Sequence, residues 1–125
     1  MTGALRDIAT AEGAAIVHCA AGKDRTGVIV ALALTAAGVE PEAIVADYTA
    51  SGDRIEAIIE RLRRSKTYAQ DVSERPVQAH TPRAGTMRAF LRQLDVRYGG
   101  LPNWLAANGF DRGEFARLRD KLRQP

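Results

Sequence analysis

Apolar residues recur at intervals of three and four over most of this chain, the spacing that places them on one face of an α-helix. Residues 54–64 are the clearest case, because apolar residues recur there at helical spacing and charged residues fill the other faces; the apolar residues are Ile55, Ile58, Ile59 and Leu62. Residues 87–98 repeat the pattern up to a pair of glycines. These periods predict two amphipathic helices, each packed by one face against the rest of the protein.

Capping residues and prolines mark the other predicted helices. Pro41 suits a first helical position, and the sequence from Asp111 to Glu114 matches a capping box. Thr2 has a side chain that caps helices. The helices predicted in this way cover residues 3–12, 41–49, 102–107 and 111–122. Residues 65–82 lack a period and contain two prolines, so they predict a loop.

Residues 14–19 differ from these helical patterns. They are apolar and β-branched at their centre, which favours a buried strand, although spacing alone does not exclude a helix. A loop over residues 20–25 follows. Residues 26–37 are apolar almost all the way round and end at Gly38, which predicts a buried helix. The whole pattern is therefore one convincing strand and five or six helices.

Composition limits the classes of function. The 125 residues suit a single domain over residues 1–125, and no run of about 18 apolar residues predicts a membrane span. The one cysteine excludes a disulfide within the chain and favours a reducing, cytoplasmic setting. A net charge of +3 suits anionic ligands, but with 6% aromatic residues it does not indicate nucleic-acid binding. Two histidines and one cysteine offer little for a metal site, and no cofactor is expected.

The candidate chemistry lies in residues 18–27, which read His-Cys-Ala-Ala-Gly-Lys-Asp-Arg-Thr-Gly. If the loop between the strand and the helix curls round, its backbone N–H groups converge with the positive end of the helix dipole to form an anion site. Arg25 adds a planar, permanently charged guanidinium group, which can donate hydrogen bonds to two phosphate oxygens at once. The same field lowers the pKa of Cys19 and makes it a thiolate nucleophile.

These ten residues resemble the active-site signature of the cysteine-dependent protein tyrosine phosphatases, Cys-x5-Arg-Ser/Thr. The sequence of this motif is most similar to that of the bacterial and fungal tyrosine phosphatases that also act on phosphoinositides. Weaker similarity extends to residues 44–51 and 98–105. The resemblance implies an α/β fold that is mostly helical with a short parallel sheet. It also implies hydrolysis of phosphotyrosine, with phosphoserine, phosphothreonine or phosphoinositide monoesters as further substrates.

The resemblance also implies a role for each residue of the signature. Cys19 attacks phosphorus and forms a phosphocysteine, while Arg25 and the backbone amides hold the phosphoryl oxygens. His18 orients the loop and helps to keep Cys19 ionised, and Thr26 hydrogen-bonds the thiolate as it leaves. Lys23 adds positive charge at the mouth and favours acidic or multiply phosphorylated substrates. The substrate-binding residues are then Ala20, Ala21, Gly22, Lys23, Asp24 and Arg25.

The leaving oxygen needs a proton at neutral pH. Asp7 is the one aspartate before Cys19, and it lies on a predicted helix. We therefore assign Asp24 as the acid, and as the base towards water in the second step, as the resemblance to lipid-active relatives also suggests. The alternative is that Asp24 pairs with a neighbouring arginine.

Other polar residues have ordinary interpretations. Asp47 and Tyr48 are expected to pack and hydrogen-bond rather than to catalyse. His80 is expected to face solvent, and the alternative is that its proline-flanked loop brings it to a substrate. The arginine-rich stretches 61–64 and 112–123 predict solvated helix faces rather than a lipid or partner site.

The family that the chain resembles has a long region before the signature, so the resemblance implies the C-terminal portion of such a protein. A parallel strand buried on both faces needs neighbours for its hydrogen bonds. These come from a preceding part of the protein, from residues 76–81, or from partner chains in a homo-oligomer. Two other functions stay open, a phosphate-binding module with little or no turnover and a redox-responsive thiol protein.

Overall fold

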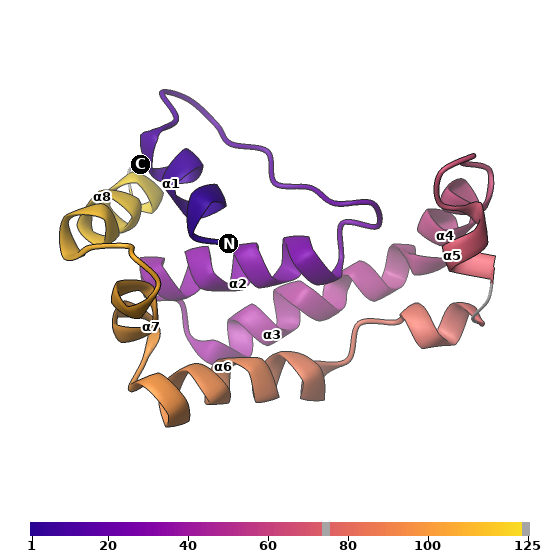
Figure 1. Cartoon of the computed structure of the whole chain (residues 1–125). Helices are drawn as coiled ribbons and strands as arrows, with labels where there is room; N and C mark the ends of the chain where they lie inside the picture. The colour runs from indigo at the N-terminus through magenta and orange to yellow at the C-terminus, as the bar shows by residue number, and fades with distance from the viewer. Residues whose placement is uncertain (74–75, 124–125) are drawn as a thin grey trace.

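The computed structural model describes residues 1–73 and 76–123, and in these residues the chain is mostly helical (Figure 1). The α-helices are α1 (Thr2–Thr10), α2 (Asp24–Ala37), α3 (Pro41–Ala50), α4 (Ile55–Arg63), α5 (Ala69–Ser73), α6 (Ala84–Tyr98), α7 (Leu101–Ala107) and α8 (Arg112–Leu122). Two 3-10 turns, η1 (Ser51–Arg54) and η2 (Val77–His80), connect some of them. No helix in the described part of the chain is long and apolar enough to cross a membrane.

Helix α2 runs through the middle of the molecule (Figure 1). Its apolar sequence is explained by its neighbours, because it contacts α1, α3, α7 and α8. Leu32 is fully buried in a cluster with residues of α1 and α6–α8, and Ala31 is buried in a second cluster with residues of α3 and α6. Gly38 adopts a left-handed conformation and ends the helix, as the sequence predicts.

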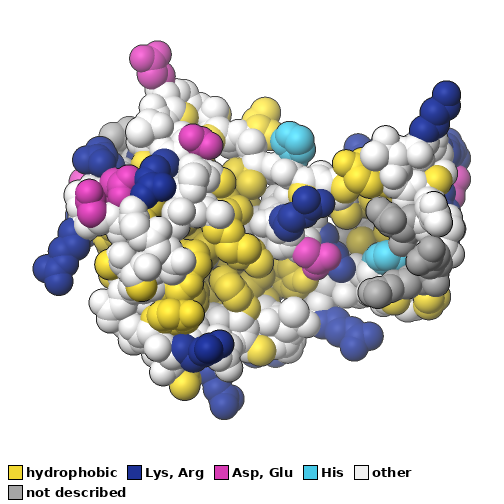
Figure 2. Space-filling model, in the orientation of Figure 1, with side chains coloured by type: hydrophobic (Ala, Val, Ile, Leu, Met, Phe, Trp, Pro, Cys, Tyr) yellow, Lys and Arg dark blue, Asp and Glu magenta, His cyan; other side chains and the backbone are white. Residues whose placement is uncertain are grey.

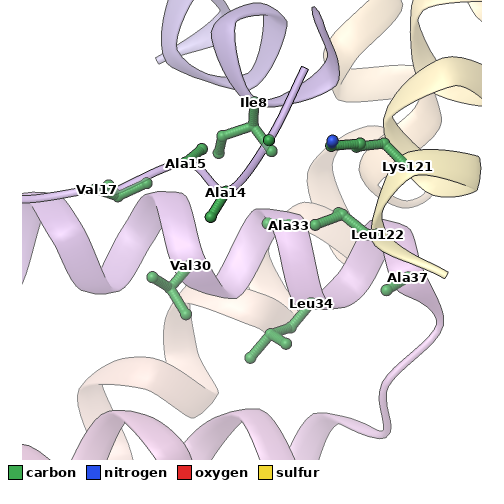
Figure 3. Close-up of a pocket in the computed structure, with 11 residues that line it drawn as sticks. Ile8, Ala14, Ala15, Val17, Val30, Ala33, Leu34, Ala37, Lys121 and Leu122 are labelled. Atoms are coloured by element: carbon green, nitrogen blue, oxygen red, sulfur yellow. The ribbon is translucent and has the colours of Figure 1, made fainter. Parts of the chain in front are cut away.

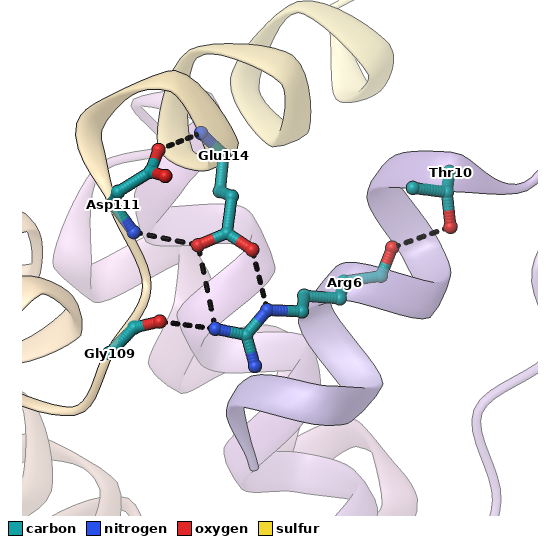
Figure 4. Close-up of polar contacts among 5 residues, drawn as sticks. All are labelled: Arg6, Thr10, Gly109, Asp111 and Glu114. Carbon is teal, nitrogen blue, oxygen red and sulfur yellow. Dashed lines mark hydrogen bonds and ion pairs between the residues drawn. The ribbon is translucent and has the colours of Figure 1, made fainter.

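Helix α1 is tied to the start of α8 by polar contacts (Figure 4). Arg6 Nε lies 2.5 Å from Glu114 Oε1, and the Arg6 guanidinium also donates to the Gly109 carbonyl. The predicted capping box is confirmed, since the Glu114 amide donates to Asp111 Oδ1 at 2.8 Å and the Asp111 amide donates to Glu114 Oε2 at 2.7 Å. Glu114 therefore caps one helix and anchors another.

The prediction of a strand over residues 14–19 is wrong for this structure. In Figure 1 the segment follows an extended course, but it belongs to no ladder, and the described residues hold no second strand with which it could pair. Ile16 is 89% exposed, while Val17 packs against the core cluster that contains Leu32. Residues 77–80, one proposed source of a neighbouring strand, form η2 instead. The short parallel sheet is therefore absent from the described residues.

Most predicted helices are confirmed, with shifted ends. Helix α2 begins at Asp24 rather than at residue 26, and α6 begins at Ala84 rather than at residue 87. Thr2 lies within α1 and caps nothing with its side chain. The predicted loop over residues 65–82 contains α5 and η2, since short helices carry too few apolar positions to show a period.

Candidate active site

The loop that follows residue 18 turns sharply and runs straight into α2. Gly22 has a φ of 66°, a left-handed conformation that glycine adopts without steric cost. The backbone amides of Gly22, Lys23 and Thr26 hydrogen-bond to the Cys19 sulfur. The loop thus directs three N–H groups at one point, next to the N-terminus of a helix of 14 residues.

These contacts set the ionisation of Cys19. Partial burial raises the pKa of its thiol, but hydrogen bonds from the Thr26 hydroxyl and from the three backbone amides outweigh burial and lower the pKa from 9.0 to about 7. About half of the thiol is therefore ionised at pH 7, whereas an ordinary thiol is almost entirely protonated. Cys19 is a free cysteine and is partly accessible, as a nucleophile must be.

Thr26 lies in the first turn of α2. Its Oγ1 is buried and has no hydrogen-bond partner among the described residues. Its proton is therefore free to turn towards the sulfur of Cys19, whose pKa this hydroxyl lowers. A hydroxyl in this position stabilises the thiolate form of Cys19.

Cys19 and Arg25 line the same pocket, which has a volume of about 580 Å3. The Arg25 side chain is exposed and forms no ion pair with any described residue, so it is available to an anion. His18 is exposed at the same pocket, and its role in keeping Cys19 ionised stays a prediction. The full lining is His18, Cys19, Ala20, Arg25, Arg61, Leu62, Ser65 and Tyr68.

The far wall of this pocket was not predicted from the sequence. It consists of Arg61 and Leu62 on α4 together with Ser65 and Tyr68 after it. The wall stands there because a hydrophobic cluster of α4 and α5 packs against Ala20 and Ala21 of the loop. Ser65 and Tyr68 follow the end of α4, so helical spacing does not reveal this wall.

Lys23 does not line the pocket. Its side chain is 11% exposed, and its Nζ donates to the His80 carbonyl at 2.7 Å. The expected charge at the mouth is therefore directed towards η2, which it fastens to the start of α2. His80 is only half exposed, contrary to expectation, and its Nε2 is buried without a partner among the described residues.

Asp24 is the first residue of α2 and also lies outside the pocket lining. Its side chain is 73% exposed, and its Oδ1 lies 3.3 Å from Lys23 Nζ. In the described residues it pairs with this lysine rather than with an arginine. A second neighbour is Tyr48 on α3: burial raises the pKa of the phenol, and the charge of Asp24 and a hydrogen bond with it raise that pKa further.

A second cavity lies away from this chemistry (Figure 3). It measures about 400 Å3 and is enclosed by α1, the extended segment, α2 and the end of α8, with Lys121 as its one charged lining residue. Figure 2 shows hydrophobic side chains in the middle of one face of the molecule, with charged side chains of both signs around them. In the described residues no three His, Cys, Asp or Glu side chains gather in a way that could hold a metal ion.

Comparisons with known sequences agree with the motif. The sequence model of the "Tyrosine phosphatase family" matches residues 1–124. The chain is 33% identical over 118 residues to the "Triple specificity protein phosphatase PtpB" of Mycobacterium tuberculosis, covering 86% of this chain and 43% of that protein. It is 35% identical over 125 residues to a "Tyrosine-protein phosphatase" of Nostoc commune, covering 95% of this chain and 42% of that protein. The chain thus spans less than half the length of these curated relatives.

Proposed function

Because the chain belongs to the tyrosine phosphatase family, we propose that it hydrolyses phosphomonoesters, phosphotyrosine above all, through a phosphocysteine formed on Cys19. One observation carries this proposal. The thiol of Cys19, with a pKa of about 7, shares a pocket with the unpaired guanidinium of Arg25. A candidate nucleophile and a candidate phosphate anchor in one pocket, at the end of a helix that favours anions, support the proposal.

In the first step, the Cys19 thiolate attacks phosphorus and the bond from phosphorus to the ester oxygen breaks. Asp24 gives its proton to that oxygen, while Arg25 and the loop amides neutralise the charge on the other phosphoryl oxygens. In the second step, water attacks phosphorus and Asp24 takes its proton. The sulfur–phosphorus bond then breaks, and the Thr26 hydroxyl donates to the departing thiolate.

Two observations support the proposed substrate class, one from the pocket and one from the relatives. Tyr68 and Leu62 give the wall opposite Cys19 an apolar and aromatic part, which suits the ring of a phosphotyrosine. Arg61 on the same wall carries a positive charge, which suits a second anionic group next to the phosphorylated residue of a substrate. The Mycobacterium tuberculosis relative is called a triple specificity protein phosphatase, which supports more than one class of substrate. Phosphoserine, phosphothreonine and phosphoinositide monoesters are the further candidates that the motif's resemblance implies.

The test is hydrolysis of 4-nitrophenyl phosphate by the purified chain. Cys19→Ser should abolish turnover, because a serine hydroxyl stays protonated at neutral pH and Cys19 is the one cysteine of the chain. Asp24→Asn should slow the hydrolysis of substrates whose leaving group needs a proton. Unchanged turnover in Cys19→Ser would end the proposal.

A second candidate is a phosphate-binding module with little turnover. It is favoured by the position of Asp24, which lies outside the pocket lining and is paired with Lys23. The anion site itself needs only the loop and the start of α2. In this case phosphate or vanadate raises the unfolding temperature of the chain while aryl phosphates remain intact. Rapid turnover by the purified chain rules this candidate out.

A third candidate is a redox-responsive thiol protein, favoured by the lowered pKa of Cys19. Peroxide oxidises such a thiolate to a sulfenic acid, and this chain offers no second cysteine to form a disulfide with it. Slow alkylation of Cys19 at pH 6 counts against this candidate and against the phosphatase.

A further inference from the structure

Tyr48 packs unusually close to the first turns of α2. A Cβ atom built on Gly27 would lie 2.8 Å from Cδ2 and 2.9 Å from Cε2 of the Tyr48 ring, closer than real Cβ atoms approach. The ring therefore occupies the space that any side chain at residue 27 would need. Tyr48 is 8% exposed and belongs to the core cluster of α2, α3 and α6, so its position is fixed by packing.

This contact brings the phenol to the face of α2 that carries Asp24. Residues 24 and 27 are three apart, and residues three apart on a helix are neighbours on its surface. Tyr48 Cε2, which touches Gly27, is bonded to the ring carbon that bears the hydroxyl. The interaction of that hydroxyl with the Asp24 carboxylate agrees with this placement.

Asp24 would otherwise be a freely rotating surface carboxylate, since its side chain is 73% exposed. Two anchored groups restrain it. Lys23 Nζ, 3.3 Å from one oxygen, is itself held by the His80 carbonyl, and the Tyr48 hydroxyl is held by the packing of its ring. A proton donor that is fixed before the reaction loses less rotational entropy in the transition state.

We propose that Tyr48 is a positioning residue for Asp24, and that its hydroxyl binds one carboxyl oxygen so that the other hands its proton to the leaving group. The inference rests on the proposed phosphatase function and deepens it. Tyr48 is not among the residues that line the pocket, so its hydroxyl is assigned a role through Asp24 rather than a direct one on the substrate. No bond to Tyr48 forms or breaks in either step.

The test compares Tyr48→Phe with wild type on two substrates. Phenyl phosphate releases phenol, whose pKa of about 10 makes protonation by Asp24 necessary. The leaving group of 4-nitrophenyl phosphate is far more acidic and depends less on an acid. Loss of one positioning hydrogen bond should lower kcat about tenfold on phenyl phosphate and less than about twofold on 4-nitrophenyl phosphate. Because the ratio of the two rates does not depend on how much protein is folded, a partly unfolded variant still gives an answer.

Two controls separate this role from general damage. Tyr98→Phe removes a hydroxyl from a residue that is 40% exposed at the end of α6, and it should leave both rates unchanged. Combining Tyr48→Phe with Asp24→Asn should slow phenyl phosphate hydrolysis no more than Asp24→Asn alone, because both changes remove one function. Equal slowing of both substrates by Tyr48→Phe, or additive losses in the double variant, overturns the proposal.

A titration that needs no catalytic activity tests the coupling of Tyr48 to Asp24 separately from the proposed phosphatase function. The phenol of Tyr48 is followed by its ultraviolet absorbance as pH rises, with Tyr48→Phe as the blank. In Asp24→Asn this phenol should ionise at a lower pH than in wild type, since the neighbouring negative charge is gone. An unchanged titration overturns the coupling even if the enzyme is active. A chain without turnover, by contrast, refutes the phosphatase while the titration still decides the coupling.

Discussion

The Thr26 hydroxyl is the side chain that most directly holds Cys19 in its thiolate form, so we expect Thr26→Ala to raise the pKa of Cys19 above about 7. The variant removes one of four hydrogen bonds to the sulfur and leaves the three backbone amides in place. A hydrogen bond to a charged acceptor contributes about 1.5 kcal/mol. Because the thiol is only partly buried, solvent screening reduces this to about 1 kcal/mol, which corresponds to about a fivefold loss of thiolate.

The rate of alkylation by iodoacetamide measures this loss, because the chain has one cysteine and the reagent attacks only the thiolate. At pH 6, where both proteins are mostly protonated, Thr26→Ala should react about fivefold more slowly than wild type. At pH 10 the two rates should coincide, since both thiols are then ionised. Thr26→Ser keeps the hydroxyl and should stay within about twofold of wild type at both pH values.

Two results would refute the reasoning. Equal rates at pH 6 would mean that the hydroxyl does not stabilise the thiolate. A Thr26→Ala rate that is reduced equally at pH 6 and pH 10 would mean that the substitution changed access to the sulfur rather than its pKa.

Three further predictions concern the scaffold. Leu105→Ala should lower the free energy of unfolding in urea by about 3 kcal/mol, because this side chain is fully buried; a loss under about 1 kcal/mol would contradict the assigned core. Gly27→Ala should destabilise the chain by about 1–3 kcal/mol despite the better helix propensity of alanine, because its Cβ displaces the Tyr48 ring; a more stable variant would show that the ring is free to move. The Arg6 guanidinium lowers the pKa of Glu114 below 4.5, so Glu114→Gln should lower the Tm at pH 7. That difference in Tm should shrink as pH falls below 4.5 and the wild-type carboxyl becomes protonated; a constant difference from pH 7 to pH 3 would contradict the ion pair.

The sequence predicted those parts of the site that are built from neighbours in the chain. The relation of Cys19 to Thr26 and to the loop amides depends on one turn and one helix start, and the spacing of the motif already contains both. The capping box at Asp111 is likewise a local pattern, and it was predicted correctly. Local hydrogen-bond chemistry, unlike tertiary packing, can be inferred from residue types and intervals.

Features that depend on distant partners were missed or misplaced. Arg61 and Tyr68 reach the pocket because α4 packs on Ala20 and Ala21. The spacing of residues within one segment does not predict such a tertiary contact. Lys23 was expected at the mouth, yet it points towards His80, which lies 57 positions away along the chain.

The predicted strand failed for a related reason. A β-branched apolar run such as residues 14–19 favours extended backbone, and the segment follows an extended course in Figure 1. A strand also needs a partner with which to exchange hydrogen bonds, however, and that requirement concerns the rest of the fold rather than the segment itself. Composition therefore predicted the local conformation but not the sheet.

The most direct test of the central claim is to trap the covalent intermediate. The purified chain is mixed with an aryl phosphate carrying a radioactive phosphoryl group, quenched in acid within the first turnovers, and digested for peptide mapping. We predict label on the peptide that contains Cys19, and no label in Cys19→Ser. Turnover that leaves this peptide unlabelled, or label attached to another residue, would contradict the account.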